Sequence, residues 1–282
     1  MSIQDQTGAL RRVFVRAPDP VAALEWRTYG WHAEPDTSGA EEEHAAFRAE
    51  LERAGAEVVS GSTDVPGDPD AIYAYDPVLM TDDGAILLRP GKEGRRAEPD
   101  AMGQDLNTLG IGLKGRVEAP GTAEGGDLCW LGPGTLLAGR GYRTNDDGIE
   151  QLRTLIGPAI DVVVFDLPHF RGPDACLHLL SFFSPLDADL AVCHLPMMPV
   201  RLFELLRERG IRPIEVPDEE FGSMGPNVLA LGPRVALALE GNPETRRRME
   251  AAGVEVRTYV GNEISRNGDG GPTCLTRPLE RG

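Results

Sequence analysis

The chain has 282 residues, with 28 Lys and Arg against 45 Asp and Glu, which gives a formal net charge of −17 at pH 7. Hydrophobic residues make up 41% of the chain, a share typical of globular rather than disordered proteins. So acidic a chain repels phosphate backbones and anionic lipids, which excludes nucleic acid and membranes as expected partners and favours a small cationic molecule.

The four cysteines, Cys129, Cys176, Cys193 and Cys274, are widely spaced and form no CxxC pair. This spacing argues against a zinc site and a redox dithiol, so we expect no metal and no cofactor. Residues 1–18 lack a basic segment followed by an apolar one, and no run of eighteen apolar residues occurs. We therefore expect a cytoplasmic protein whose thiols stay free.

One pattern occurs five times along the chain: an amphipathic helical segment, a glycine near its end, and a β-branched strand. In the first copy, at residues 40–60, Gly55 is placed to end the helix. The expected buried face of that helix comprises Ala46, Phe47, Glu50, Leu51 and Ala54. The other copies span residues 101–119, 148–168, 200–217 and 243–260, with Gly110, Gly157, Gly210 and Gly253 in the matching place.

Hairpin-like segments separate these copies, at residues 76–90, 127–141, 182–196 and 227–241. Strand-like runs at residues 13–18 and 274–279 predict that the two chain ends complete the fifth unit and close a ring, which removes exposed sheet edges. A doubly wound parallel sheet is the competing architecture, but it does not account for the hairpins. We predict an α/β fold with five units in a single domain over residues 1–282.

Cys274 follows a glycine-rich stretch that leaves its sulfur open and lets backbone amides face a ligand, so it is the candidate nucleophile. The other three cysteines are expected to be small buried residues. His178 begins an apolar strand after a polar loop, where its ring can face a central cavity or pack in the core.

Glu124 and Asp127 flank two glycines in the sequence EGGD. Two glycines permit close approach of the backbone, and the paired acids can orient a histidine or hold a cation. A hairpin turn is the alternative interpretation of this segment.

Taken in order, EGGD, HLxS and GGPTCLT resemble motifs of the guanidino-group-modifying enzymes, which include arginine deiminases, dimethylarginine dimethylaminohydrolases and amidinotransferases. Residues 75–96 and 139–152 resemble segments of the dimethylarginine hydrolases, so the similarity runs nearly end to end. The resemblance implies a five-bladed α/β propeller of pseudo-repeated ββαβ units around a central active-site cavity.

The same resemblance implies that Cys274 is the nucleophile, His178 the general acid and base, and Glu124 the group that orients His178. A guanidinium carbon is poorly electrophilic, so it requires a thiolate. Its attack leaves a thiouronium-like intermediate on Cys274, after His178 has protonated the departing amine.

The resemblance also implies substrate-binding roles. Asp76, and Asp70 six residues before it, match carboxylates that hold the guanidinium, although Asp70 also suits a turn. Arg95 and Arg143 match positions that clamp a substrate carboxylate, and either also suits the surface. Asp127 is a further candidate for binding the cation.

Two departures bear on the substrate. Leu180 stands where arginine deiminases carry an aspartate, and an apolar residue there favours an N-methylated guanidine. Tyr75 stands where the dimethylarginine hydrolases usually have an acid.

The leading hypothesis is a hydrolase that converts an Nω-methylated arginine to citrulline and a methylamine. An arginine deiminase-like hydrolase, an amidinotransferase and a binding propeller without catalysis are the alternatives. Formation of a homo-oligomer stays open, and residues 26–39 suit either a mobile cover or a linker.

Overall fold

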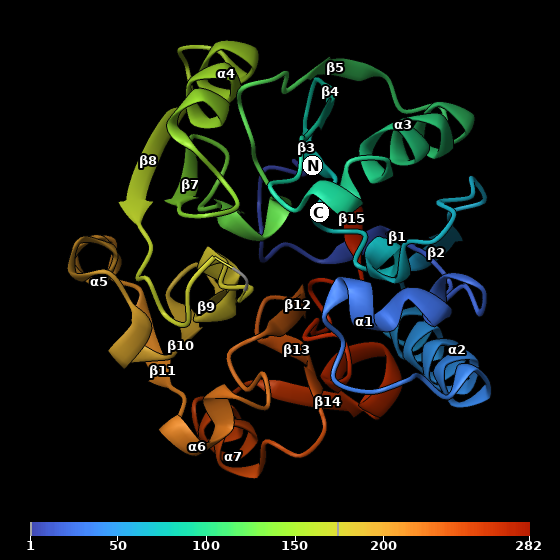
Figure 1. Cartoon of the computed structure of the whole chain (residues 1–282). Coiled ribbons are helices and arrows are strands. Elements are labelled where there is room, and N and C mark those ends of the chain that lie inside the picture. Colours follow the sequence, from blue (N-terminus) through green and yellow to red (C-terminus); the bar gives the residue numbers. More distant parts are fainter. Residues whose placement is uncertain (1, 174) are drawn as a thin grey trace.

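The computed structural model describes residues 2–173 and 175–282, and it contains five three-stranded sheets within them. Each sheet combines an antiparallel pair with a third strand that runs parallel to the middle one. A helix lies between the two parallel strands in the sequence, because parallel strands need a long crossover connection. In Figure 1 the five units follow one another around the molecule in chain order.

The elements of the five units have the following bounds. The first comprises β15 (Arg277–Arg281), β1 (Leu10–Val15), α2 (Thr37–Arg53) and β2 (Glu57–Ser60). The second comprises β3 (Val78–Thr81), β4 (Gly84–Leu87), α3 (Glu98–Thr108) and β5 (Leu113–Arg116). The third comprises β6 (Leu128–Trp130), β7 (Thr135–Arg140), α4 (Asp146–Ile156) and β8 (Asp161–Asp166).

The fourth comprises β9 (Phe183–Asp187), β10 (Leu190–Cys193), α5 (Val200–Glu208) and β11 (Arg212–Glu215). The fifth comprises β12 (Val228–Gly232), β13 (Val235–Leu239), α7 (Pro243–Ala251) and β14 (Glu255–Tyr259). Short helices between the units include η1 (Ala22–Glu25), α1 (Trp26–Tyr29), η2 (Pro69–Ile72), η3 (Glu93–Arg95), η4 (Gly125–Asp127), η5 (Leu179–Ser181), η6 (Leu195–Met197), α6 (Asp218–Phe221) and η7 (Asn262–Arg266).

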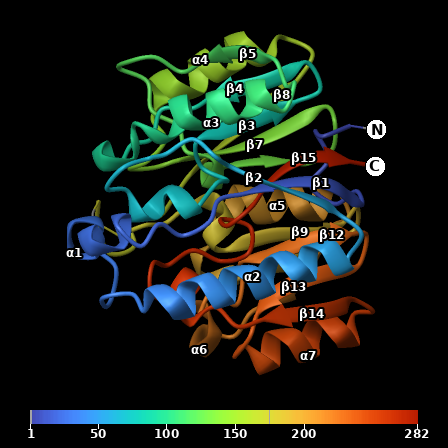
Figure 2. The same cartoon turned by 90° about the vertical axis from the view of Figure 1, so that its right-hand side faces the viewer.

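The predicted joining of the chain ends is confirmed. Strand β1 pairs with β15 antiparallel, with Leu10 opposite Arg281 and Phe14 opposite Arg277. Figure 2 shows both termini on the same side of the molecule, where these two strands lie side by side. Since no described sheet exceeds three strands, the doubly wound alternative is wrong.

The five glycines predicted to end the helical segments all have positive φ angles, between 71° and 94°. An L-residue rarely adopts this conformation, so the repeated glycine marks each turn from helix to strand. On α2 the predicted face is partly wrong. The helix buries Phe47 and Leu51 as expected, but it also buries His44, while Ala46 is exposed.

Apolar side chains of the strands and helices pack in several clusters between and behind the sheets. These clusters anchor the strands, and Asp76, Glu124, His178 and Cys274 each stand a few residues before one of them, β3, β6, β9 and β15 respectively. None of the helices within the described residues has the length and apolarity needed to cross a membrane.

Burial of His44 on α2 leads to a prediction about stability and pH. Burial, with a smaller effect of Arg48, lowers the pKa of His44 from 6.5 to about 4. Between these two pH values His44 is protonated in the unfolded chain but neutral in the folded chain. The stabilising contribution of neutral, buried His44 is therefore complete above pH 6.5 and is lost as the pH falls toward 4. Between pH 7 and pH 5 the loss is about 2 kcal/mol.

We expect His44→Leu to remove this loss, measured as the difference between the unfolding free energies at pH 7 and pH 5 by denaturant titration. The exposed His169, whose Nδ1 contacts the neutral Tyr142 hydroxyl, provides the matched control, and His169→Leu should keep the wild-type difference. The same pH dependence in His44→Leu and the wild type would contradict the assignment.

Candidate active site

The EGGD segment brings Glu124 to a fully buried position just before η4. A Cβ atom on Gly125 would lie 2.1 Å from the backbone oxygen of Tyr75, and one on Gly126 would lie 2.4 Å from Nδ1 of His178. The two glycines therefore let this turn pack directly against the segment before Asp76 and against the imidazole ring.

His178 lies against the buried carboxylate. Its Nε2 is 2.6 Å from Oε2 of Glu124, so Nδ1 is the ring nitrogen left to face other groups. The HLxS motif has a local reason as well, because the backbone N–H of His178 donates to Oγ of Ser181 at 2.9 Å. The serine thereby holds the backbone from which the histidine projects.

Charges around this pair shift both groups in opposite directions. Burial alone would raise the pKa of Glu124, but the hydrogen bond and charge of His178, together with Arg143, hold it well below its usual range. Burial disfavours the charged form of His178, but Cys176, Asp127 and Asp76 raise its pKa well above its usual range. An ionised carboxylate beside a protonated imidazole is the state that these shifts favour.

Cys274 lies in the turn before β15, partly buried. Its backbone oxygen accepts a hydrogen bond from the N–H of Tyr75 at 3.1 Å, and its Sγ accepts one from Nδ2 of Asn227 at 3.3 Å. Burial and Asp76 raise the pKa of the Cys274 thiol to about 11, while His178 and Asn227 act in the opposite direction. The thiol is therefore protonated at neutral pH unless a further positive charge arrives.

Asp76 connects the segments around the thiol. Its Oδ1 accepts the backbone N–H of Gly126 at 2.8 Å, and its Oδ2 accepts Nη1 of Arg95 at 2.7 Å. Arg95 is buried, and its Nε and Nη2 donate to the two carboxylate oxygens of Glu98 at 2.5 and 2.9 Å. The Arg95 guanidinium thus binds carboxylates of the protein, whereas the sequence predicted that it binds a carboxylate of the substrate.

The two remaining predicted residues on this side contact the catalytic candidates. Nη1 of Arg143 lies 3.3 Å from each carboxylate oxygen of Glu124. Oδ1 of Asp127 accepts the backbone N–H of Leu179 at 3.1 Å, directly after His178. Burial raises the pKa of Asp127 to about 6.

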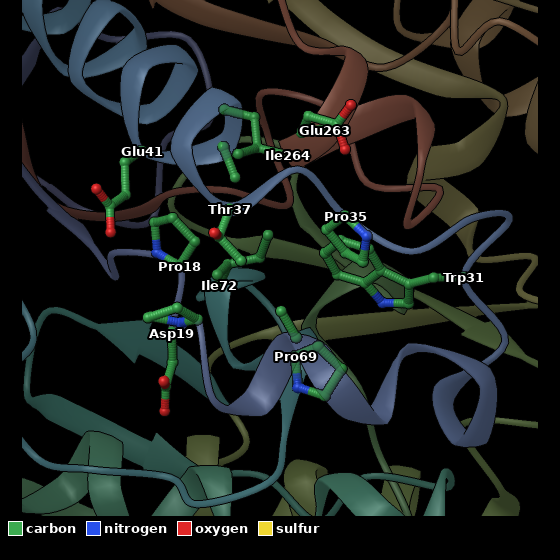
Figure 3. A pocket seen from close by; sticks show the side chains of 13 residues that line it. Pro18, Asp19, Trp31, Pro35, Thr37, Glu41, Pro69, Ile72, Glu263 and Ile264 are labelled. Atoms are coloured by element: carbon green, nitrogen blue, oxygen red, sulfur yellow. The ribbon is translucent and has the colours of Figure 1, made fainter.

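Asp70 lies on η2 and is held by two donors. Nε1 of Trp31 donates to its Oδ1 at 2.8 Å, and Nζ of Lys92 donates to its Oδ2 at 2.6 Å. Figure 3 shows Trp31 with Pro69 and Ile72 among the residues that line a small apolar pocket. That pocket contains none of the predicted site residues, so it is separate from the candidate active site.

The prediction that Cys176 is buried is wrong. Cys176 is exposed, and its Sγ lies 3.6 Å from Nδ1 of His178. The ring of Tyr75 lies under the Arg277 guanidinium at 3.7 Å, and its hydroxyl contacts Gln6. Leu180 is buried in the apolar cluster that also contains Tyr75.

Asp76, Glu124 and His178 each offer one ligand atom within 4.8 Å of the others, an arrangement that could also hold a cation. In the structure these atoms already serve the protein, since His178 bonds to Glu124 and Asp76 bonds to Arg95.

Sequence reasoning missed three contributors, Lys92, Glu98 and Asn227. Lys92 is one of only two lysines in the chain, which was a usable signal. Glu98 and Asn227 stand in segments without a distinctive motif, and only the folded chain brings them to Arg95 and Cys274.

Comparisons with known proteins point in one direction. The family model of arginine deiminase matches residues 106–211 and 201–281. An N(G),N(G)-dimethylarginine dimethylaminohydrolase of Pseudomonas aeruginosa is 30% identical over 249 residues, which cover 86% of this chain and 89% of that protein. A protein of the same name from Streptomyces coelicolor is 30% identical over 269 residues, which cover 94% of this chain and 96% of that protein.

Solved structures agree with these matches. The dimethylarginine dimethylaminohydrolase of Pseudomonas aeruginosa, as a cysteine-to-serine variant with citrulline, has a TM-score of 0.76 at 25% identity, covering 95% of this chain and 98% of that one. The N-terminal domain of ArgZ, a cyanobacterial arginine dihydrolase, has a TM-score of 0.82 at 18% identity, covering 96% and 97%, and this likeness concerns the fold alone.

Proposed function

Because the chain belongs to the guanidino-group-modifying enzymes, and is a hydrolase acting on C–N bonds of amidines, we propose that it cleaves an Nω-substituted guanidine through a covalent intermediate on Cys274. The observation that carries the proposal is the contact of His178 with buried Glu124, next to Asp76 and the Cys274 turn. We also propose that the five sheets form a propeller around this site.

In the first half of the reaction, Asp76 holds the substrate guanidinium by ionic hydrogen bonds. The bound cation lowers the pKa of Cys274, which opposes the effect of burial and of Asp76. The thiol releases its proton to solvent, the resulting thiolate forms a C–S bond to the guanidinium carbon, and His178 transfers a proton to the departing amine. The C–N bond breaks, and a thiouronium group remains on Cys274.

In the second half, neutral His178 takes a proton from water, whose oxygen attacks the same carbon. The C–S bond breaks, the remaining hydroxyl proton passes to the departing sulfur to restore the thiol, and the product is a urea derivative. Glu124 orients the imidazole and stabilises its charged form throughout. Asp127 supports the same ring by fixing the backbone of Leu179.

For the reacting end of the substrate, Nω-methylated arginine is the leading candidate, with citrulline and a methylamine or dimethylamine as products. Two relatives carry the name dimethylarginine dimethylaminohydrolase, and Leu180 replaces an aspartate that would require a free NH₂ group. Arg143 is the proposed partner of a substrate carboxylate. We assign Arg95 to holding Asp76, because Glu98 and Asp76 take its donors.

Hydrolysis of unmodified arginine is a second candidate, because arginine deiminases are also among the relatives. One from Mycobacterium marinum is 31% identical over 189 residues, which cover 56% of this chain and 46% of that protein. An amidinotransferase would use the same Cys274 intermediate with an amine in place of water.

Incubation with a panel of guanidines, scored by mass spectrometry for ureido products, tests substrate and reaction together. We expect ureido products from methylated arginines without an added acceptor. Transfer products that appear only with an added amine would identify an amidinotransferase instead. The proposed function would be contradicted if none of the guanidines gave either a covalent adduct or a released product.

A further inference from the structure

The carboxylate of Asp70 already carries a cation supplied by the protein. The residue is only 5% exposed, and its two oxygens accept the Trp31 indole N–H at 2.8 Å and the Lys92 ammonium at 2.6 Å. A contact of this length between ionised groups is among the stronger hydrogen bonds in proteins. A substrate cation could reach Asp70 only by displacing or sharing this ammonium.

Lys92 is fixed in the wall of the candidate active site. Its backbone N–H donates to Oε1 of Glu124 at 3.1 Å, so its main chain touches the carboxylate that orients His178. Its Nζ also donates to the backbone oxygen of Tyr29 at 2.7 Å and lies 4.8 Å above the Tyr29 ring. These contacts hold the ammonium in place over Asp70.

The neighbouring carboxylates leave no free acid for a second cation, because the proposed reaction assigns Asp76 to the substrate guanidinium and Glu98 is bonded to Arg95. Asp76 and Glu98 bind the Arg95 guanidinium, whose Nε also lies 3.8 Å from Asp70. An ammonium on the substrate tail that approaches Asp70 would therefore meet two positive charges, those of Lys92 and Arg95. Repulsion between like charges in a partly buried site is costly.

We propose that Lys92 is a specificity-determining residue, whose ammonium takes the place of a second substrate cation and directs the enzyme to guanidines with no ammonium group on their tail. The inference rests on the proposed function: it keeps the methylated guanidine as the reacting group but changes the tail, so that Nω-methylarginine itself becomes the poorer substrate. The favoured class is a guanidine with a carboxylate or neutral tail.

The test compares Nω-methylarginine with its desamino analogue, a methylguanidino pentanoate of equal chain length. We expect the wild type to have a kcat/KM at least about tenfold higher for the desamino compound, and Lys92→Met to lower this ratio at least about tenfold. Lys114, the only other lysine, pairs with exposed Asp83 at 2.9 Å and provides the matched control. Lys114→Met should keep the wild-type ratio.

Two outcomes would overturn the inference: a wild-type preference for the amino compound, or an equal ratio in the wild type and Lys92→Met. Lys92→Gln, which keeps a donor but not the charge, replaces Lys92→Met if the latter does not fold. If neither variant folds, the test is the wild-type ratio of kcat/KM for the desamino compound to that for Nω-methylarginine.

Binding separates this inference from the proposed reaction. Calorimetry with a Cys274→Ser protein should give the same order of affinities for the two compounds, and Lys92→Met in that background should reverse or remove it. If neither compound is turned over but the desamino compound binds more tightly, the proposed reaction is wrong and the role of Lys92 stands. If both compounds are turned over but the desamino compound does not bind more tightly, the proposed reaction stands and the role of Lys92 is wrong.

Discussion

Cys274→Ser is expected to lower turnover of a methylated guanidine by at least about a thousandfold while ligand binding persists. A serine hydroxyl has a far higher pKa than a thiol, so neither His178 nor a bound cation can convert it to a competent nucleophile at neutral pH. Asp76, Arg143 and Glu124 are untouched by this change, so the ligand keeps its proposed partners. Steady-state kinetics and calorimetry on the same preparation measure the two effects.

Chemical labelling identifies the reactive thiol independently. A haloacetamidine, whose charge imitates the guanidinium, should alkylate Cys274 in the wild type faster than it alkylates exposed Cys176. Peptide mass spectrometry locates the adduct. Near-normal turnover in Cys274→Ser, or labelling confined to Cys176, would remove Cys274 from the mechanism.

His178→Ala is the second change with a large expected effect, a loss of turnover of about a hundredfold to ten thousandfold. Without the imidazole, the departing amine lacks its proton donor and water lacks its base. Any adduct that still forms on Cys274 should persist, and intact-mass measurement would detect it. Normal steady-state turnover would exclude His178 from the reaction.

A second histidine-carboxylate pair provides the matched control. His194 is also buried, and its Nε2 lies 3.0 Å from Oδ1 of Asp218 on α6, outside the candidate site. His194→Gln should retain turnover. The pH dependence gives a second measurement on the wild type. Its raised pKa keeps the His178 imidazole protonated at neutral pH, so this group can donate a proton to the departing amine. Where amine release limits the rate, turnover should therefore fall as the pH rises through the pKa of His178.

Much of the architecture could be predicted from local patterns. The glycine at the end of each helical segment has a positive φ in all five units, and the apolar runs at the two chain ends do pair. These features are readable because turn chemistry and strand alternation are encoded within a few residues. The face of α2 was misjudged at His44, because packing from other elements decides which side a weakly patterned helix buries.

The site was predictable only as far as motifs reach. EGGD, HLxS and GGPTCLT predicted Glu124, His178 and Cys274 as site residues, and the structure brings Glu124 and His178 into contact across 54 positions of sequence. The partners of Arg95 and Asp70 could not be inferred, because Glu98 and Lys92 meet them through side-chain directions that spacing does not specify. Exposure of Cys176 likewise depends on the path of a loop rather than on its composition.

Pairing of β1 with β15 has a consequence for how activity arises during synthesis. Cys274 precedes β15 by three positions, and the strand that receives β15 is the first of the chain, so about 260 residues separate the partners. Such distant contacts form late in folding, because the entropy cost of closing a long loop must be met before the contacts can stabilise the chain. The four other sheets can assemble on the ribosome before Cys274 is synthesised, so the proposed nucleophile reaches its place only when β15 pairs with β1.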